Sequence, residues 1–273
     1  MMVPVTEADI RASFVNCSKG DAKRLSIPRD LGDRPWEDLD FLGWGDPTLR
    51  GRCYIVVPLG DELAGVAFRC DVANEADVRS LIETTESQSG PVDLYCSNAG
   101  VALGFAPRVD NAAAGPDELW QRAWSVNVMG HVYAVRNLVP RMKSRGGGTF
   151  LITVSAAGLL TQIGSAIYST TKHAAVGFAE NIAIAHRDDG IKVSILCPQA
   201  VDTPLLRGLP SGPQSADGIL SPAQVAQAAI QGIERETFLI LPHAEVQEYM
   251  RRKMEDRDRW INGMARLARR MSE

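Results

Sequence analysis

Residues 149–198 have the sequence TFLITVSAAGLLTQIGSAIYSTTKHAAVGFAENIAIAHRDDGIKVSILCP. Its two ends, 149–155 and 191–198, are short apolar runs that predict buried β-strands. Between them, residues 168–190 favour a long helix that ends at Gly190, a residue type common just after a helix C-terminus. This order predicts two parallel strands joined by a helical crossover.

Similar elements follow one another on both sides of this stretch. Their patterns predict helices over 75–87, within 117–148 and over 221–235, and strands over 91–100 and 237–242. Short strands that alternate with helices are typical of a parallel sheet covered on both faces. The predicted fold class is therefore α/β, with a doubly wound parallel sheet.

The last residues, 243–273, differ from this pattern because they are rich in charge. Arg and Lys are mixed there with large apolar and aromatic side chains, namely Tyr249, Trp260, Ile261, Met264 and Leu267. This mixture predicts an amphipathic helical tail that covers the domain or a partner subunit, with a helix on a membrane surface as the alternative.

Composition limits the classes of function. The 273 residues are 45% hydrophobic and 23% charged, and a net charge of −4 provides no basic field for nucleic acid. No apolar run reaches the roughly 18 residues of a membrane span, and the N-terminus lacks the pattern of a signal peptide. The five cysteines form no C-x-x-C pair, which argues against a zinc cage or a disulfide framework. We therefore expect a cytoplasmic protein that binds no metal, nucleic acid or membrane.

Tyr168 and Lys172 form a Y-x-x-x-K motif at the start of the predicted helix. Side chains four residues apart lie on one face of a helix, about 5–6 Å apart at Cβ. A tyrosine with its ordinary pKa near 10 is a poor base at neutral pH, but a neighbouring ammonium lowers that pKa. Tyr168 is therefore a candidate general acid/base, although Y-x-x-x-K alone also occurs on solvated helix faces.

Four further residues or motifs lie near this pair in the predicted fold. Ser155 comes at the end of a buried strand, where parallel sheets form their ligand crevice, and its hydroxyl could hold a substrate oxygen beside the phenol. SNAG (97–100) ends the preceding strand, Asn127 lies at the head of the long helix, and CPQAVDTP (197–204) follows the next strand. These positions predict one site at the carboxyl edge of the sheet.

This order of motifs resembles the short-chain dehydrogenase/reductase family, whose sequences carry N-N-A-G, N, S, Y-x-x-x-K and P-G-x-V-x-T in turn. The resemblance covers residues 66–243 and implies a Rossmann-like fold and alcohol–carbonyl interconversion with NAD or NADP. It also implies a homodimer or homotetramer, since the helices over 127–144 and 168–187 form the subunit interface in that family.

The family's functional residues can be carried over to the matching positions. Tyr168 would give a proton to the substrate oxygen or remove it, Lys172 would lower the pKa of Tyr168 and bind the nicotinamide ribose, and Ser155 would orient the substrate. Asn127 would anchor a proton relay through water. The other implied cofactor contacts are Asn98, Ala99 and Gly100 in the crevice, Asp71 near the adenine, and Val201 and Thr203 at the carboxamide.

Some positions depart from the family or concern the substrate. Ser97 stands where an Asn is usual, and Gln199 stands where a Gly is usual, so that the turn differs or the side chain meets the cofactor. By the same resemblance, residues 204–220 form a substrate lid. Its only charged clamp is Arg207, which favours an uncharged alcohol or ketone.

A larger departure lies upstream. The family begins with a strand, a T-G-x-x-x-G-x-G loop and a helix whose N-terminus receives the pyrophosphate, and residues 1–70 contain no such loop. The sheet is therefore expected to lack its first βαβ unit, which would leave one edge of the strand at 92–96 unpaired. The segment that selects NAD or NADP would be missing with it.

Residues 1–68 instead resemble the N-terminal part of the FBP-domain family, whose members resemble elongation factor G-binding proteins. The strings TEADIRASFVNCSKGDAKRL, PWEDLDFLGWGDP and YIVVP carry this likeness, but no cysteine pairs follow for the zinc finger of that family. A helix and a β-hairpin of 53–58 with 63–70 are predicted, and the hairpin either extends the sheet or packs separately. The expected domains are 1–66, 67–242 and the tail, 243–273.

Three functions are open on the sequence alone. The intact Ser–Tyr–Lys–Asn set favours an active NAD(P)-dependent oxidoreductase. The absent glycine-rich loop favours a pseudoenzyme or fusion product that does not bind dinucleotide tightly. Residues 1–68 alone favour an elongation-factor-binding module.

Overall fold

The computed structural model describes residues 70–106, 111–209 and 212–271, together with Phe68 and the short strands β1 (Arg24–Ser26), β2 (Arg52–Cys53) and β3 (Ala64–Val66). The predicted N-terminal helix and most of the predicted hairpin lie outside these residues.

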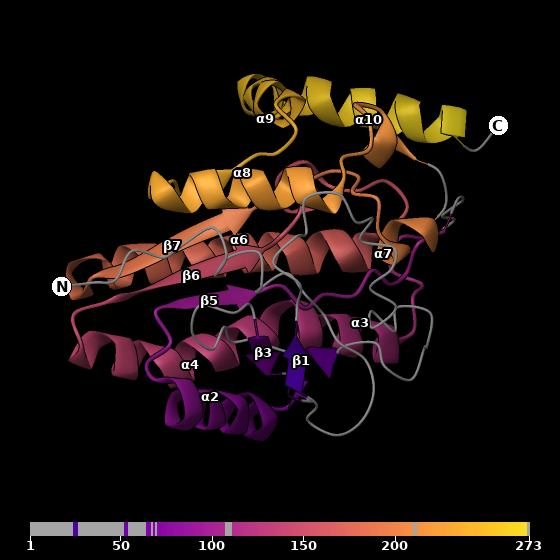
Figure 1. Ribbon diagram of the computed structural model, residues 1–273. Helices are drawn as coiled ribbons and strands as arrows, with labels where there is room; N and C mark the ends of the chain where they lie inside the picture. Colours follow the sequence, from indigo (N-terminus) through magenta and orange to yellow (C-terminus); the bar gives the residue numbers. More distant parts are fainter. Residues whose placement is uncertain are drawn as a thin grey trace.

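The centre of the described chain is a four-stranded parallel sheet (Figure 1). Its strands, hydrogen-bonded in sequence order, are β5 (Leu94–Ser97), β6 (Gly148–Thr153), β7 (Ile191–Leu196) and β8 (Leu239–Ile240). β6 and β7 pair along their whole length, from Gly148 opposite Ile191 to Thr153 opposite Leu196. The predicted parallel sheet is confirmed, and the carboxyl ends of its strands lie at one edge.

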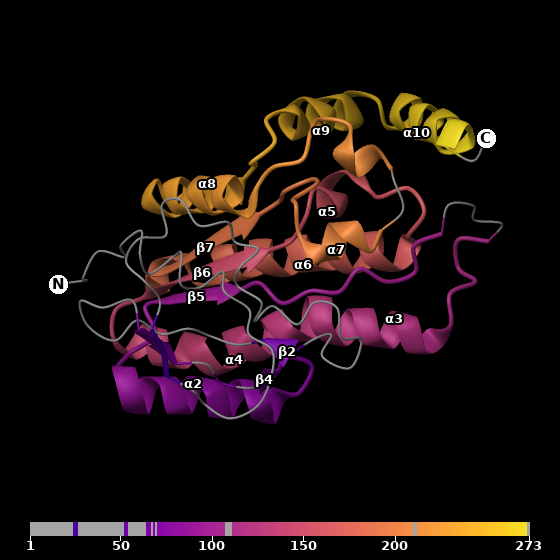
Figure 2. The same ribbon diagram turned by 45° about the vertical axis from the view of Figure 1, so that its right-hand side comes forward.

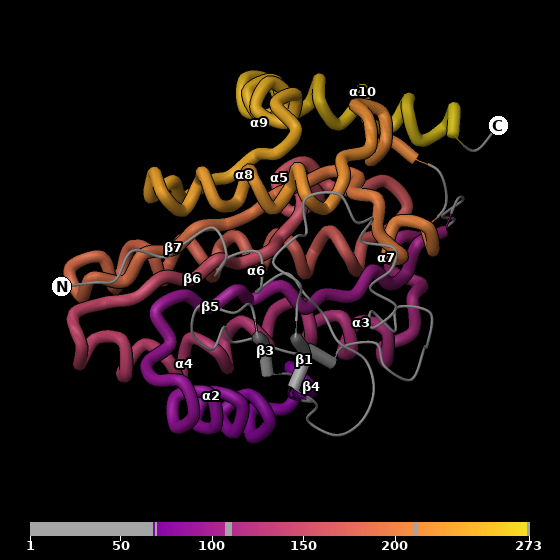
Figure 3. Tube along the Cα trace, viewed as in Figure 1, coloured from indigo at the N-terminus to yellow at the C-terminus, as the bar shows by residue number. Residues whose placement is uncertain are grey.

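Helices cover both faces of this sheet (Figures 1 and 3). One face carries α4 (Gly130–Ser144) and α6 (Ala166–Ala185), with α2 (Glu75–Ser89) outside α4, and the other carries α8 (Pro222–Glu234). The strand residues alternate accordingly, because Phe150 and Ile152 pack with the first layer and Leu151 packs with α8. The sheet is therefore covered on both faces, as predicted.

Residues 117–144 form three consecutive helical segments. α3 (Asp117–Trp124) passes into a π-helical turn, η4 (Ser125–Met129), before α4 begins. Such turns occur frequently at functional sites, and this one contains Asn127. The sequence predicted helix within 117–148 but carried no local signal for this π turn.

Short helices lie in the loops between these elements. They are α5 (Ala157–Leu160), η5 (Arg187–Asp189), α7 (Pro204–Arg207) and η6 (Pro213–Ser215). α5 follows β6, and α7 and η6 follow β7, so three of them stand at the carboxyl edge of the sheet.

The predicted helical tail consists of two helices, α9 (Glu245–Glu255) and α10 (Arg257–Met271). Between them Asp256 has extended backbone (φ −148°, ψ 95°), and its side chain accepts a hydrogen bond of 2.9 Å from the Arg259 backbone N–H. Asp256 therefore ends α9 and caps the N-terminus of α10. Figure 2 shows both helices above α5 and α7. None of the described helices is long and apolar enough to cross a membrane.

The N-terminal strands form two small antiparallel sheets. β2 pairs with β4 (Cys70–Asp71), with Cys53 opposite Cys70. These two cysteines are the first and last residues of the predicted hairpin, so the pairing at its outer end agrees with the prediction. β3, in contrast, pairs with β1, a strand that the sequence pattern did not predict. Among the described strands, β5 pairs with β6 alone. The β2–β4 pair therefore stands apart from the main sheet and does not extend it.

Candidate active site

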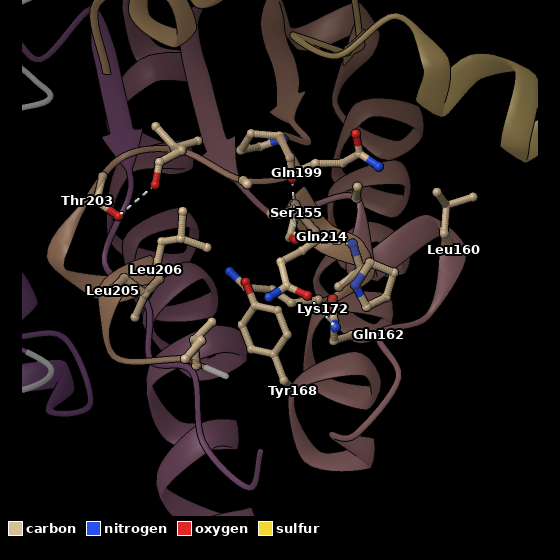
Figure 4. Close-up of a pocket in the computed structure, with 18 of the residues that line it drawn as sticks. Ser155, Leu160, Gln162, Tyr168, Lys172, Gln199, Thr203, Leu205, Leu206 and Gln214 are labelled. Carbon is tan, nitrogen blue, oxygen red and sulfur yellow. Dashed lines mark hydrogen bonds between the residues drawn. The ribbon is translucent and has the colours of Figure 1, made fainter. Parts of the chain in front are cut away.

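A cavity of about 1270 Å³ lies at the carboxyl edge of the sheet, beyond the ends of β5, β6 and β7. Figure 4 shows Ser155 and Lys172 beside Tyr168 in this cavity, with Leu205 and Leu206 on another side of the tyrosine. Sites for a single small molecule usually measure about 300–1,000 Å³. This cavity is large enough for two ligands side by side.

Tyr168 lies in the first turn of α6, where the helix cap fixes its backbone. The Ser165 Oγ accepts a hydrogen bond of 3.1 Å from the Tyr168 backbone N–H and donates one of 2.8 Å to the Leu103 carbonyl. The centroid of the tyrosine ring is 5.5 Å from that of Phe105. The cap ties the start of α6 to the segment after β5, and Phe105 packs beside the phenol.

Lys172 lies one turn further along α6 and is 3% exposed. Its Nζ donates to the Thr153 carbonyl at 3.2 Å and is 5.7 Å from the centroid of the Tyr168 ring. Ser155 stands in the turn after β6, where its Oγ accepts from the Ala157 backbone N–H at 3.1 Å. Three of the four side chains predicted to be catalytic, Ser155, Tyr168 and Lys172, thus come together at one cavity.

Burial shifts the pKa values of Tyr168 and Lys172 towards their neutral forms. Burial raises the pKa of Tyr168 above its usual 10, and a hydrogen bond with the Ser155 side chain opposes this shift. Burial likewise lowers the pKa of Lys172 to about 8. We expected the lysine to lower the pKa of the tyrosine, but in this structure the net shift is upward because burial disfavours the phenolate.

Asn127 is fully buried in the π turn and links three segments. Its Oδ1 accepts from the Val101 backbone N–H at 2.8 Å, and its Nδ2 donates to the Val101 carbonyl at 3.0 Å and to the Thr171 hydroxyl at 3.1 Å. A Cβ atom at Gly100 would lie 3.5 Å from both the Asn127 Oδ1 and the Lys172 Nζ. Asn127 does not line the cavity but lies directly behind the residues that do.

The cofactor residues implied by the family resemblance divide into two groups. Those that line the cavity, besides Tyr168 and Lys172, are Asn98, Gly100, Val201 and Thr203. Ala99 packs against the core instead. Asp71 is also outside the cavity, since its Oδ1 accepts from the Ala73 backbone N–H at 3.0 Å and its Oδ2 lies 3.9 Å from the Arg122 guanidinium.

Both departures from the family pattern have partners in the structure. The Ser97 hydroxyl lies 2.6 Å from the Nδ1 of buried His131, so the serine forms a hydrogen bond. The Gln199 side chain donates to the Asp217 carboxylate at 3.0 Å, and its backbone N–H donates to the His243 Nδ1 at 3.2 Å. Gln199 thereby joins the turn after β7 to the lid segment and to the start of the tail.

Several cavity residues were not predicted as site residues. Gln162, just after α5, donates through its Nε2 to the Oε1 of Gln214 in the segment 204–220, at 3.1 Å. The tail contributes Tyr249, Arg252, Trp260, Met264 and Leu267. The amphipathic pattern of the tail indicated a covering role but carried no signal for what it covers.

Comparison with known proteins identifies the family. The sequence model of the short chain dehydrogenase family matches residues 59–214, more than half of the chain. The chain belongs to the short chain dehydrogenase family. A second model, described as the FBP C-terminal treble-clef zinc-finger, matches residues 9–102 and overlaps the first. Among curated relatives, 1-deoxy-11-beta-hydroxypentalenate dehydrogenase of Streptomyces exfoliatus is 31% identical over 193 residues, which are 70% of this chain and 69% of that protein.

Solved structures agree with this assignment. A short chain dehydrogenase/reductase of Burkholderia phymatum in complex with NAD is 27% identical with a TM-score of 0.58, over 70% of this chain and 75% of that chain. L-sorbose reductase of Gluconobacter frateurii, complexed with NADPH and L-sorbose, is 26% identical with a TM-score of 0.54, over 63% and 72% of the two chains. The chain thus has a Rossmann-like fold and is homologous to dehydrogenases that act on CH–OH groups.

Proposed function

We propose that this short chain dehydrogenase interconverts an alcohol and a ketone or aldehyde with NAD or NADP, with Tyr168 as the general acid/base. The observation that carries the proposal is the convergence of Ser155, Tyr168 and Lys172 on one cavity at the carboxyl edge of a parallel sheet. Relatives in complex with NAD and with NADPH support the choice of cofactor.

Tyr168 handles the proton of the reaction. Because burial keeps the pKa of the phenol above its usual value, the hydroxyl is protonated at neutral pH and ready to donate to a carbonyl oxygen as it becomes an alcohol. In the opposite direction the phenolate accepts the alcohol proton. Ser155, whose hydroxyl lies in the same part of the cavity, holds the substrate oxygen beside the phenol (Figure 4).

Lys172 stabilises the phenolate whenever it forms. Its pKa of about 8 leaves the amine mostly protonated at neutral pH, and its Nζ is 5.7 Å from the tyrosine ring. A cation at this distance lowers the energy of a negative charge on the phenol more effectively in a buried site than in water. Asn127 positions the pair from behind, because it fixes both the segment after β5 and Thr171 of α6.

The residues around Lys172 fit the nicotinamide–ribose end of a dinucleotide. Gly100 lines the cavity there, and a Cβ at this position would lie in van der Waals contact with the Asn127 Oδ1 and the Lys172 Nζ, at 3.5 Å from each. Asn98 and Thr203 contribute polar groups at the same edge. When bound there, the nicotinamide supplies the hydride chemistry.

The residues present fit the pyrophosphate end of a dinucleotide less well than its nicotinamide end. The sequence carries no glycine-rich loop over residues 1–70, and Asp71, the implied adenine contact, lies outside the cavity. A pseudoenzyme or fusion product without tight dinucleotide binding is therefore the second candidate. The match of residues 9–102 to the FBP zinc-finger model supports a third, an elongation-factor-binding module.

Titration of the purified chain with NADH and NADPH, followed by nicotinamide fluorescence, tests the proposal. Binding in the micromolar range is expected, and its absence at millimolar cofactor would overturn the active-enzyme assignment in favour of a pseudoenzyme. A pull-down with elongation factor G tests the third candidate.

A pair of variants tests the role of Tyr168. Tyr168→Phe should lower turnover by at least about 100-fold while cofactor affinity stays within about twofold. Tyr133→Phe, at a partly buried tyrosine of α4 whose ring lies 5.7 Å from the Arg136 guanidinium, is the matched control and should retain full turnover. Retained activity in Tyr168→Phe would refute the assigned role.

A further inference from the structure

One wall of the cavity is an apolar face of the last helix, α10. Trp260, Met264 and Leu267 line the cavity, and their spacing of four and three residues places them on one side of the helix. Leu267 is still 36% exposed. No residue of α10 is fully buried. Trp260 packs against a small core cluster of Ala156, Leu160 and Val246, whereas Met264 and Leu267, further along the helix, line the cavity.

α9 fixes the position of this wall. Val246 of α9 is fully buried, and the Lys253 amine donates to the Leu159 carbonyl in α5, the short helix that follows Ser155. The Tyr249 hydroxyl donates to the Asp217 carboxylate at 2.8 Å. α10 is thereby held beside the catalytic turn, with the ring centroids of Trp260 and Tyr249 6.4 Å apart.

A second part of the cavity wall is also apolar. It is formed by Leu205 and Leu206 of α7 and by Leu209 just after it, and Figure 4 shows the first two next to Tyr168. A molecule whose oxygen meets Ser155 and Tyr168 would therefore extend between two hydrocarbon surfaces.

The charged side chains that line the cavity, apart from the lysine of α6, are engaged with other groups of the chain. The Arg207 guanidinium lies 3.0 Å from the Asp202 carboxylate, and the Arg252 Nε donates to the Glu248 carboxylate at 2.7 Å. The Asp217 carboxylate accepts two hydrogen bonds, from the Tyr249 hydroxyl and the Gln199 amide. These pairs already satisfy much of the charge that lines the cavity, and an uncharged substrate would leave all of them undisturbed.

We propose that the faces of α10 and α7 form a subsite for the bulky hydrocarbon part of an uncharged secondary alcohol or ketone. This deepens the proposed function and rests on it for the reaction, though not for binding. Burial of apolar surface between Met264, Leu267 and the α7 leucines supplies the affinity. The volume of about 1270 Å³ accommodates a fused-ring molecule beside a nicotinamide.

Calorimetry with decahydro-β-naphthol, an uncharged fused-ring secondary alcohol, tests the subsite on the full chain without cofactor. Truncation of the wall in the double variant Met264→Ala, Leu267→Ala should weaken binding roughly tenfold. Ile261→Ala, on the outer side of α10 where the side chain is 56% exposed, should bind within twofold of wild type. Equal losses in both variants, or none in the double variant, would overturn the proposal.

Two further arms complete the test. Met264→Trp should narrow the cavity and weaken binding of the fused-ring alcohol, with circular dichroism confirming an unchanged fold. Decalin carboxylate, the charged analogue, should bind at least tenfold more weakly than the alcohol, and equal affinity would contradict an uncharged substrate.

Because no turnover is measured, binding without activity would leave the subsite intact and reject only the proposed function. Turnover of isopropanol without binding of the fused-ring alcohol would support the proposed function and reject the subsite.

Discussion

Tyr168 and Lys172 share one buried corner of the cavity, and burial moves their pKa values in opposite directions. The pKa of the phenol rises and that of the ammonium falls, because a low-dielectric environment disfavours either charge. Their spacing in the sequence predicted that they would lie on one face of α6. The spacing could not predict the direction of the two pKa shifts, because the atoms that desolvate the two side chains come from segments far apart in the chain.

The lowered pKa of Lys172 leads to a prediction for stability. Between pH 8 and the ordinary lysine pKa of 10.5, the unfolded chain holds a proton that the native chain has released. The free energy of unfolding should therefore rise with pH across this window. Lys172→Met lacks this contribution, so the stability of wild type relative to the variant should grow between pH 8 and 10.5, by at most roughly 3 kcal/mol. Urea denaturation of both proteins at several pH values measures it, and a pH-independent difference would contradict the shift.

Asn127 gives a second prediction at this scale. Asn127→Ala should lower the free energy of unfolding by roughly 2 to 3 kcal/mol, because the buried N–H and carbonyl of Val101 both lose their side-chain partner. Asn137→Ala on α4 is the control, since its side chain donates within its own helix, to the Tyr133 carbonyl. It should cost less than about 1 kcal/mol in the same denaturation experiment. Similar losses in both variants would show that Asn127 has no special linking role.

Among the elements, those with local signals were predicted and those set by distant contacts were not. The strands of the main sheet and α2, α6 and α8 have apolar patterns and caps near the expected positions, such as Asn74 before α2 and Ser221 before α8. α6 begins at Ala166, two residues before the predicted start, because Ser165 caps it. The π turn at Asn127 and the pairing of β1 with β3 have no comparable pattern, since each depends on packing against other parts of the molecule.

The cap of α6 should matter for both stability and turnover. Ser165→Ala removes the acceptor for the Tyr168 backbone N–H and the bond to the Leu103 carbonyl, which should cost about 1 kcal/mol or somewhat more. It should also lower kcat several-fold, because the first turn that carries the tyrosine loosens. Asn74→Ala, which removes the cap of α2, should cost a similar amount and leave kcat unchanged. A parallel fall of kcat in both variants would mean that the effect is one of general stability.

For the molecule as a whole, the resemblance of the motifs predicted the family, and strand order predicted where the candidate catalytic residues lie. Neither predicted which segments border the site. Ser155, Tyr168 and Lys172 lie at the edge where parallel strands end, which is a rule of topology. The cavity is closed, however, by α9 and α10, which join it from the far end of the chain. The tail sequence is amphipathic, and amphipathicity indicates that a surface is covered without indicating which surface it is.

The two tail helices should therefore differ in what they contribute to the molecule. A chain ending at Asp256 loses α10, which buries no residue of its own, and its Tm should fall by no more than about 3 °C. A chain ending at His243 also loses α9, with the fully buried Val246 and the bond from Lys253 to the Leu159 carbonyl. Burial of one such side chain is worth about 1.5–3 kcal/mol, so its Tm should fall by roughly 5 °C or more. Thermal denaturation of the two truncated chains beside the full chain decides the point. If loss of α10 alone caused the larger fall, the helix would be a structural part of the core and not a wall of the cavity.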